Sequence, residues 1–187
     1  MPEDFRSAMR RVAATVSVLS TELHGRRFGI TVSSLASLTL EPPTLCFGLH
    51  RASSFCHPMI ESGWVCVNVL SQAQESVGRA FATPPASEAR FHAGRWSIYE
   101  ARGRVPSHGC IRLPLLADAQ ANLVCRVTRA IEHGTHFLCL AEVAEVAIRD
   151  QVEPLLYCDG DYRQLAFPAD NGSLLRVRID GASHGGE

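Results

Sequence analysis

The stretch Gly29-Ile30-Thr31-Val32-Ser33-Ser34 carries three hydroxyl side chains and a glycine in a run that otherwise has the pattern of an apolar strand. A hydroxyl on a strand is a short donor and acceptor on a stiff support. A glycine in a strand lets a ligand approach the backbone. The stretch therefore favours a binding edge for a polar ring system or a phosphate. Thr31 and Ser33 would also suit the half-exposed face of an ordinary strand, since threonine favours strands.

A second strand-like run, Pro42-Pro43-Thr44-Leu45-Cys46-Phe47-Gly48-Leu49, follows and is succeeded by a hydroxyl pair, Ser53-Ser54. These hydroxyls precede a helical turn, Pro58 to Glu61, which Gly63 ends in the way common at helix C-termini. Hydroxyls together with unpaired backbone N–H groups at such a turn can hold an anion. We therefore expect an anion-binding turn after this strand.

The length and composition of the chain limit the possible classes of protein. The chain has 187 residues, of which 46% are hydrophobic and 20% charged, and its net charge is −1. This is enough for one domain with a full core, which we place at residues 1–167, followed by a polar and mobile tail at 168–187. The charge balance gives no reason to expect binding to nucleic acid or to an anionic membrane. No apolar run reaches the roughly 20 residues of a membrane span, so we expect a cytoplasmic protein.

The seven cysteines are an odd number and include no Cys-x-x-Cys pair. Four of them lie inside apolar strand-like runs, where a free cysteine behaves as a small hydrophobe: Cys46, Cys66, Cys125 and Cys139. A zinc site needs clustered ligand spacing, which the sequence lacks. The pattern predicts reduced thiols in a reducing compartment and no metal.

The hydrophobic periodicity indicates a mainly β chain with few helices. Helical spacing of apolar residues predicts an amphipathic helix over residues 3–14 that covers one end of the core. The motif Ser71-x-x-Gln74 is a capping box that opens a second helix through about Phe81. Strands are predicted at 14–21, 28–34, 42–49, 64–70, 121–131 and 136–148, with a closing hairpin at 154–165. Six or seven strands predict a closed antiparallel sheet, that is, a small barrel.

Two parts of this pattern remain open. The regular pattern is lost over residues 83–114, which we expect to form a long surface excursion anchored by Arg90-Phe91 and Trp96. Asn68 is the one polar residue in the run Trp64 to Leu70, and burying it without partners would cost a few kcal/mol. It therefore either ties down the neighbouring backbone or reaches a ligand.

The order of the short motifs resembles that of the short-chain flavin reductases with an FMN-binding split-barrel fold. It is most similar to the reductase components of two-component aromatic hydroxylases, such as 4-hydroxyphenylacetate 3-monooxygenase, over residues 4–166. The motifs are Phe5-Arg6-x-Ala8-Met9, Gly29 to Ser34, Leu40-x-Pro42-Pro43, Ser53-Ser54, Ser62-Gly63, Val67 to Leu70, Gln74, Phe81-Ala82, Arg90-Phe91, Trp96, Gly134-Thr135-His136, Leu155-Leu156-Tyr157 and Tyr162-Arg163.

The resemblance implies an antiparallel Greek-key split barrel with peripheral helices that forms a homodimer. It implies an NAD(P)H:flavin oxidoreductase that binds FMN, or FAD in some members, and supplies reduced flavin to a separate oxygenase. His136 would lie beside the nicotinamide as a positioning donor; without the resemblance it is a turn histidine exposed to water. The implied cofactor-binding residues are Gly29, Thr31, Val32, Ser33, Ser34, Phe47, Gly48, Leu49, Ser53, Ser54, Asn68, Arg90, Phe91 and Tyr162.

Some positions and functions stay open within this resemblance. Residues 101–120 lack the usual short Gly-x-Pro-x-Leu-x-Gly-Ala-Leu pattern, and the cation near the phosphate is either Arg51 or Arg90. Tyr162 and Arg163 contact the cofactor or a dimer mate, or are a strand-end aromatic and a solvated charge. One alternative function is a non-catalytic flavin store or sensor on the same barrel. Another is pyridoxamine-phosphate oxidation, which needs a second basic pocket that the sequence does not provide.

Overall fold

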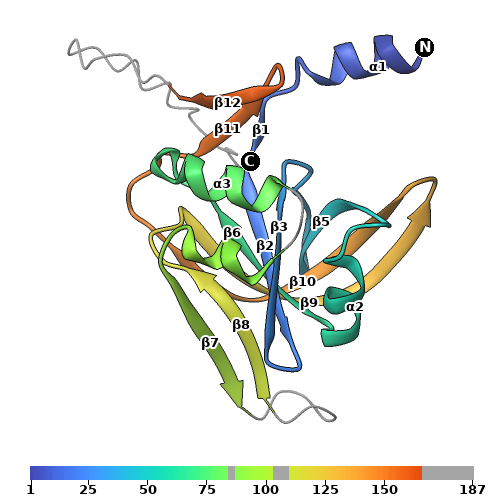
Figure 1. The fold of residues 1–187 in the computed structure, drawn as a ribbon. Helices are drawn as coiled ribbons and strands as arrows, with labels where there is room; N and C mark the ends of the chain where they lie inside the picture. Colours follow the sequence, from blue (N-terminus) through green and yellow to red (C-terminus); the bar gives the residue numbers. More distant parts are fainter. Residues whose placement is uncertain (84–86, 103–109, 166–187) are drawn as a thin grey trace, which may run out of the picture.

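The computed structural model of the protein describes residues 1–83, 87–102 and 110–165 (Figure 1). Its centre is a seven-stranded antiparallel sheet with the strand order β3-β2-β6-β9-β10-β5-β4. The strands of this sheet are β2 (Ser17–Leu23), β3 (Arg26–Val32), β4 (Ala36–Leu40), β5 (Pro43–His50), β6 (Trp64–Val69), β9 (Ala121–His133) and β10 (His136–Ile148). The predicted mainly β architecture is confirmed, whereas β4 was not among the predicted strands.

Smaller elements surround the sheet. A three-stranded sheet joins β1 (Ala14–Thr15), β11 (Leu155–Cys158) and β12 (Asp161–Gln164), and β7 (Trp96–Arg102) pairs with β8 (Cys110–Leu116). The helices are α1 (Pro2–Met9), α2 (Cys56–Ser62) and α3 (Glu75–Ala82), with 3-10 turns η1 (Gln72–Gln74) and η2 (Glu88–His92). None of the described helices is long and apolar enough to cross a membrane.

The hydrophobic core forms between the sheet and the elements folded over it. Alternate residues of β5 point inward, so Phe47 and Leu49 are buried beside Met59 of α2. Cys125 and Cys139 are fully buried in the same core, as expected for cysteines used as small hydrophobes. Burial disfavours the thiolate and raises the pKa of both thiols to about 12.

The helix boundaries follow local signals in the sequence. The capping box at Ser71 is confirmed, because the Ser71 N–H donates to the Gln74 side chain at 3.0 Å before α3 begins. Gly63 ends α2 in the left-handed conformation (φ 69°), which a glycine adopts without steric cost. Both signals are short-range, which explains why the sequence predicted them correctly.

The helix predicted over residues 3–14 is present but shorter, and the prediction that it covers the core is wrong. Helix α1 ends at Met9, none of its residues is buried, and Phe5 is 70% exposed. In Figure 1, α1 projects away from the central sheet. The chain leaves the helix because Ala14 pairs with Tyr157 of β11 and the Val16 N–H donates to the Leu155 carbonyl at 2.9 Å.

The long surface excursion predicted over residues 83–114 is also wrong. The described part of this segment contains η2 and the β7–β8 hairpin, and Leu113 is buried against Trp64 in a cluster of its own. The two predicted anchors do pack inward, since Phe91 and Trp96 contact each other and Phe81 with ring centroids 4.9–5.2 Å apart. The predicted mobile tail, 168–187, lies outside the described residues.

Candidate functional site

A groove of about 330 Å³ lies where β3, the turn after β5 and helix α3 meet. It gathers four residues that the sequence predicted as cofactor-binding from separate stretches: Gly29, Ser53, Ser54 and Arg90. The remaining lining residues are Ile30, His50, Ala52, Phe81 and Ala82. The groove therefore joins apolar and aromatic walls to a few polar groups, the usual composition of a small-molecule site.

The floor of the groove depends on the glycine of β3. A Cβ atom on Gly29 would stand 2.5 Å from Cε1 of Phe81, so the absence of a side chain lets α3 lie against the strand. Phe81 is itself fixed by edge-to-face contact with Phe91 at 5.0 Å. The aromatic wall is thus built by close backbone approach from one side and by ring packing from the other.

We expect Gly29→Ala to destabilise the fold by about 1–3 kcal/mol, the usual cost of overpacking a filled site. The reason is that Phe81 and α3 must move to accommodate the new methyl group. Urea unfolding of both proteins measures the change. Gly48→Ala is a matched control on β5, since its Cβ would meet only Ser34 at ordinary contact distances of 3.7 and 3.8 Å. Equal stabilities of the two variants would contradict this account of Gly29.

The turn that follows β5 presents the predicted hydroxyl pair. The Ser53 N–H donates to the His50 carbonyl at 2.9 Å, and the Ser53 hydroxyl accepts the Phe55 N–H at 3.2 Å. The Ser53 hydroxyl therefore helps to shape the turn, while Ser54 is exposed and lines the groove. A hydroxyl held on a tight turn of this kind is suited to bind an oxyanion.

Arg90 supplies the cation of the groove. Its guanidinium donates to the Gly29 carbonyl at 3.3 Å and to the Thr83 carbonyl, so it joins η2 to β3 and to the end of α3. Its Nε atom is buried and has no hydrogen-bond partner among the described residues. Desolvation lowers the pKa of Arg90 because burial penalises the charged form. A partly buried cation that lines a groove is suited to bind an anionic group.

The alternative cation, Arg51, lies elsewhere. It forms an ion pair with Glu132 of β9 and does not line the groove. Of the two arginines that the sequence left open, Arg90 is the one that lines this groove, and its role beside a phosphate stays a prediction.

A smaller hollow of about 160 Å³ continues the groove past Arg90. The two spaces share Gly29, Ser54 and Arg90 as lining residues. The hollow adds Arg26 and Arg27 from the start of β3 and Glu88 from η2. Positive charge is therefore concentrated at this end of the site, away from His50 and Ala82.

A pair of histidines marks the other end of the groove. His50 closes β5 and pairs in register with His136, the first residue of β10, and their ring centroids are 5.1 Å apart. His50 Nδ1 accepts the Ala52 N–H at 3.2 Å, and His136 Nδ1 lies 2.8 Å from the Thr135 hydroxyl. His136 is exposed and is not one of the lining residues, so it lies at the rim, beside the groove wall formed by His50.

Several other predicted cofactor residues have buried side chains. Phe47 and Leu49 are 1% and 2% exposed, and Phe91 is 5% exposed within the aromatic cluster. The side chains of these residues therefore do not face the groove, and a cofactor contact through their backbone stays a prediction. The physical reason is strand alternation, because Phe47 and Leu49 project to the face of β5 opposite to that of Gly48.

Asn68 is a structural residue and not a ligand contact. It is fully buried on β6, and its amide donates to the Val18 carbonyl and to the Ser20 hydroxyl, each at 2.9 Å. Its carbonyl oxygen accepts the Leu116 N–H and the Asn122 amide, each at 2.8 Å. The predicted cofactor role of Asn68 is therefore corrected, since its side chain joins β2, β8 and β9.

The remaining hydroxyls are used within the protein or face another hollow. The Thr31 hydroxyl donates to the Gly78 carbonyl at 2.7 Å, and the Ser34 hydroxyl bonds both the Gly48 N–H and the Gly48 carbonyl, at 3.0 and 3.1 Å. A separate hollow of about 370 Å³ is lined by Thr31, Val32, Ser33 and Tyr162. The predicted set is therefore divided between two neighbouring spaces.

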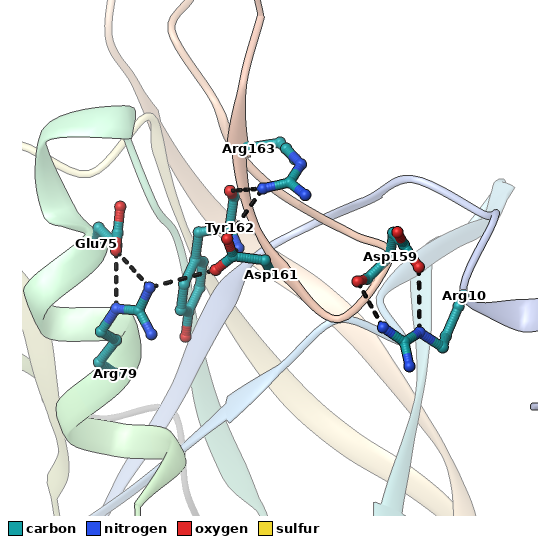
Figure 2. A network of polar contacts seen from close by, with 7 residues as sticks. All are labelled: Arg10, Glu75, Arg79, Asp159, Asp161, Tyr162 and Arg163. Atoms are coloured by element: carbon teal, nitrogen blue, oxygen red, sulfur yellow. Dashed lines mark hydrogen bonds and ion pairs between the residues drawn. The ribbon is translucent and has the colours of Figure 1, made fainter.

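Figure 2 shows the polar contacts among residues of α3 and the terminal hairpin, beside the second hollow. Arg79 of α3 bonds Glu75 at 2.7 Å and reaches Asp161 of β12 at 3.4 Å, and its guanidinium lies 4.6 Å from the Tyr162 ring. Arg163 pairs with Asp161 at 3.0 Å. Asp161 and Tyr162 thus help to hold the terminal hairpin against α3, whereas Arg163 pairs within β12.

The sequence reasoning missed His50 and the walls Phe81 and Ala82. His50 could have been found, because it directly follows the strand Pro42 to Leu49 and precedes the hydroxyl pair. The contribution of Phe81 depends on how α3 lies against Gly29, which no local pattern reveals.

Comparisons with known proteins fit this geometry. Residues 9–166 match the family described as the flavin reductase like domain. The FMN reductase (NADH) RutF of Variovorax paradoxus is 35% identical over 88% of this chain and 86% of its own. Its namesake in Ancylobacter novellus is 36% identical over 88% of this chain and 85% of its own. The structure of the NADH:FAD oxidoreductase SgcE6 of Streptomyces globisporus, in complex with NAD and FAD fragments, is 26% identical and covers 91% of this chain and 98% of that one, with a TM-score of 0.76.

Proposed function

This chain belongs to the flavin reductase-like domain family, and on that basis we propose that it is an NADH-dependent FMN reductase whose groove between β3, the 50–54 turn and α3 holds the flavin. The observation that carries the placement is Arg90, whose side chain lines the groove together with Ser53 and Ser54. Such a donor set suits the phosphate of FMN.

The residues divide the groove into two ends. Ser54 and Arg90 hold the phosphate, with the turn backbone around Ser53 beside them. Ile30 and Ala82 give the apolar surface on which a flat ring system packs, with the buried Phe81 ring supporting them from behind. A bound flavin supplies the redox chemistry, accepting a hydride from the nicotinamide. The protein therefore needs to orient two ring systems and exclude water between them; a general base is not required.

His136 and His50 lie at the ring end and are proposed to position the nicotinamide. Each histidine has one ring nitrogen hydrogen-bonded to its own turn, which fixes the ring and leaves the other nitrogen for a ligand. His136 is the positioning donor in this scheme, and His50 is the wall against which its ring rests.

We expect His136→Ala to raise the KM for NADH roughly tenfold, while the Kd for FMN changes less than twofold. The reason is that one hydrogen bond to the nucleotide, worth about 1.5 kcal/mol, is lost. Steady-state kinetics with separate flavin titrations measure both values. His57→Ala is the matched control, because His57 is exposed, lies 3.3 Å from Glu61 and does not line the groove. Unchanged kinetics in the His136 variant would contradict its role in positioning the nicotinamide.

The finer architecture belongs to the same proposal. Closure of the seven-stranded sheet into a split barrel is supported by Ser34, which follows β3 and whose hydroxyl bonds the backbone of Gly48 on β5. Val32 and Phe47 of the two strands also share one core cluster. A homodimer, a separate oxygenase that receives the reduced flavin and a cytoplasmic location remain predictions from the sequence.

The direct test is an anaerobic assay of the purified protein. We expect NADH to remove the visible absorbance of added FMN, with NADPH giving a slower or equal rate. Absence of turnover with both nucleotides would overturn the proposal. Tight FMN binding without nucleotide oxidation would instead support the flavin store.

A further inference from the structure

The residues that line the hollow beyond Arg90 affect which flavin the groove can bind. It measures about 160 Å³, and an ion pair between Arg27 Nε and Glu88 Oε1, at 2.5 Å, lies in its lining. Any group attached to a phosphate at Ser54 and Arg90 has to enter this hollow or turn out into solvent, because the hollow shares those residues with the groove.

Arg27 is held firmly in place. Its guanidinium carbon lies 4.5 Å from the centroid of the Phe91 ring, and Phe91 is itself packed against Phe81 and Trp96. The Arg27 side chain is 28% exposed, compared with 56% for Glu88. Stacking on an aromatic ring together with an ion pair leaves the guanidinium little freedom to move aside for a ligand.

We propose that the Arg27–Glu88 ion pair makes this enzyme select FMN over FAD. FAD differs from FMN by an adenylate joined to the flavin phosphate, which adds a second phosphate group and a bulky nucleoside. Glu88 places a carboxylate where that second phosphate enters, and it also neutralises the cation that would otherwise bind it. Selection by a repulsive group against the unwanted ligand is a general device of specific sites.

This inference rests on the proposed function, and a comparison of both flavins separates the two. We expect the wild-type protein to bind FMN at least tenfold more tightly than FAD, measured by quenching of flavin fluorescence. Glu88→Gln should reduce the ratio of FMN to FAD affinity roughly tenfold by strengthening FAD binding. The reason is that Arg27 is then free to pair with the diphosphate. The double variant with Arg27→Gln should lose this gain, because the coupling needs both residues.

Glu142→Gln is the matched control, because Glu142 also pairs with an arginine, Arg126, at 2.5 Å but lies outside the groove. Its FMN-to-FAD ratio should stay at the wild-type value. Equal affinities of the wild-type protein for the two flavins would overturn the inference and leave the reductase assignment standing. The same conclusion would follow if the Glu88→Gln variant kept the wild-type ratio of FMN to FAD affinity, or if it differed from the wild type only in its KM for NADPH. Binding of neither flavin, with no NADH oxidation, would overturn both.

Discussion

Replacing Arg90 with alanine should weaken FMN binding by roughly 10- to 100-fold. The guanidinium stays charged at neutral pH, although burial lowers its pKa, and a charge-assisted hydrogen bond to a phosphate is worth about 1.5–3 kcal/mol. Fluorescence titration of the purified variant with FMN measures the loss. Arg90→Lys should recover part of the affinity, because it restores the charge without the planar fork.

Riboflavin binding distinguishes the loss of a phosphate contact from a general disturbance of the groove in the Arg90 variant. Arg90 also bonds the Gly29 and Thr83 carbonyls, so its removal could loosen the site as a whole. Riboflavin has the same ring system without the phosphate, and its affinity should change less than twofold in the variant. Arg95→Ala provides the matched arginine control, since Arg95 is exposed and pairs with Asp118 away from the groove. Equal losses of FMN and riboflavin binding would contradict the phosphate role.

Replacing Asn68 with leucine should lower the free energy of unfolding by about 3–5 kcal/mol. Its removal leaves several buried groups without partners, among them the Leu116 N–H and the Asn122 amide, and each unsatisfied group costs about 1–3 kcal/mol. A domain of this size is stable by only about 5–15 kcal/mol, so the variant should be close to unfolding at physiological temperature.

Urea denaturation of the variant beside Gln151→Leu tests this expectation. The Gln151 amide bonds Glu153 at 2.7 Å on an exposed turn, so its loss should cost less than 1 kcal/mol. An Asn68→Leu variant as stable as the wild type would show that β2, β8 and β9 are held together by apolar packing alone. Loss of FMN affinity in a variant of unchanged stability would restore the ligand role that the sequence left open.

Local sequence patterns predicted the elements whose signals are short-range. The hairpin of β9 and β10 turns at Gly134, and the terminal hairpin turns at Gly160, both with positive φ. The predicted end of the N-terminal helix at residue 14 was wrong for the opposite reason, since α1 ends at Met9. Its apolar spacing was correct for a helix, but Val16 is drawn into the core next to Leu155, a contact that is distant in sequence.

The sequence by itself determined the mainly β class, the family resemblance and the presence of a hydroxyl-rich edge around Gly29 and Ser53-Ser54. Tertiary structure decided which of those residues share a space. It placed Arg90 and not Arg51 in the groove, added His50, and turned Phe47 and Leu49 into the core. The physical reason is that hydrogen-bonding capacity and strand periodicity are properties of neighbouring residues, whereas a groove forms only where strands and helices from distant parts of the chain pack together.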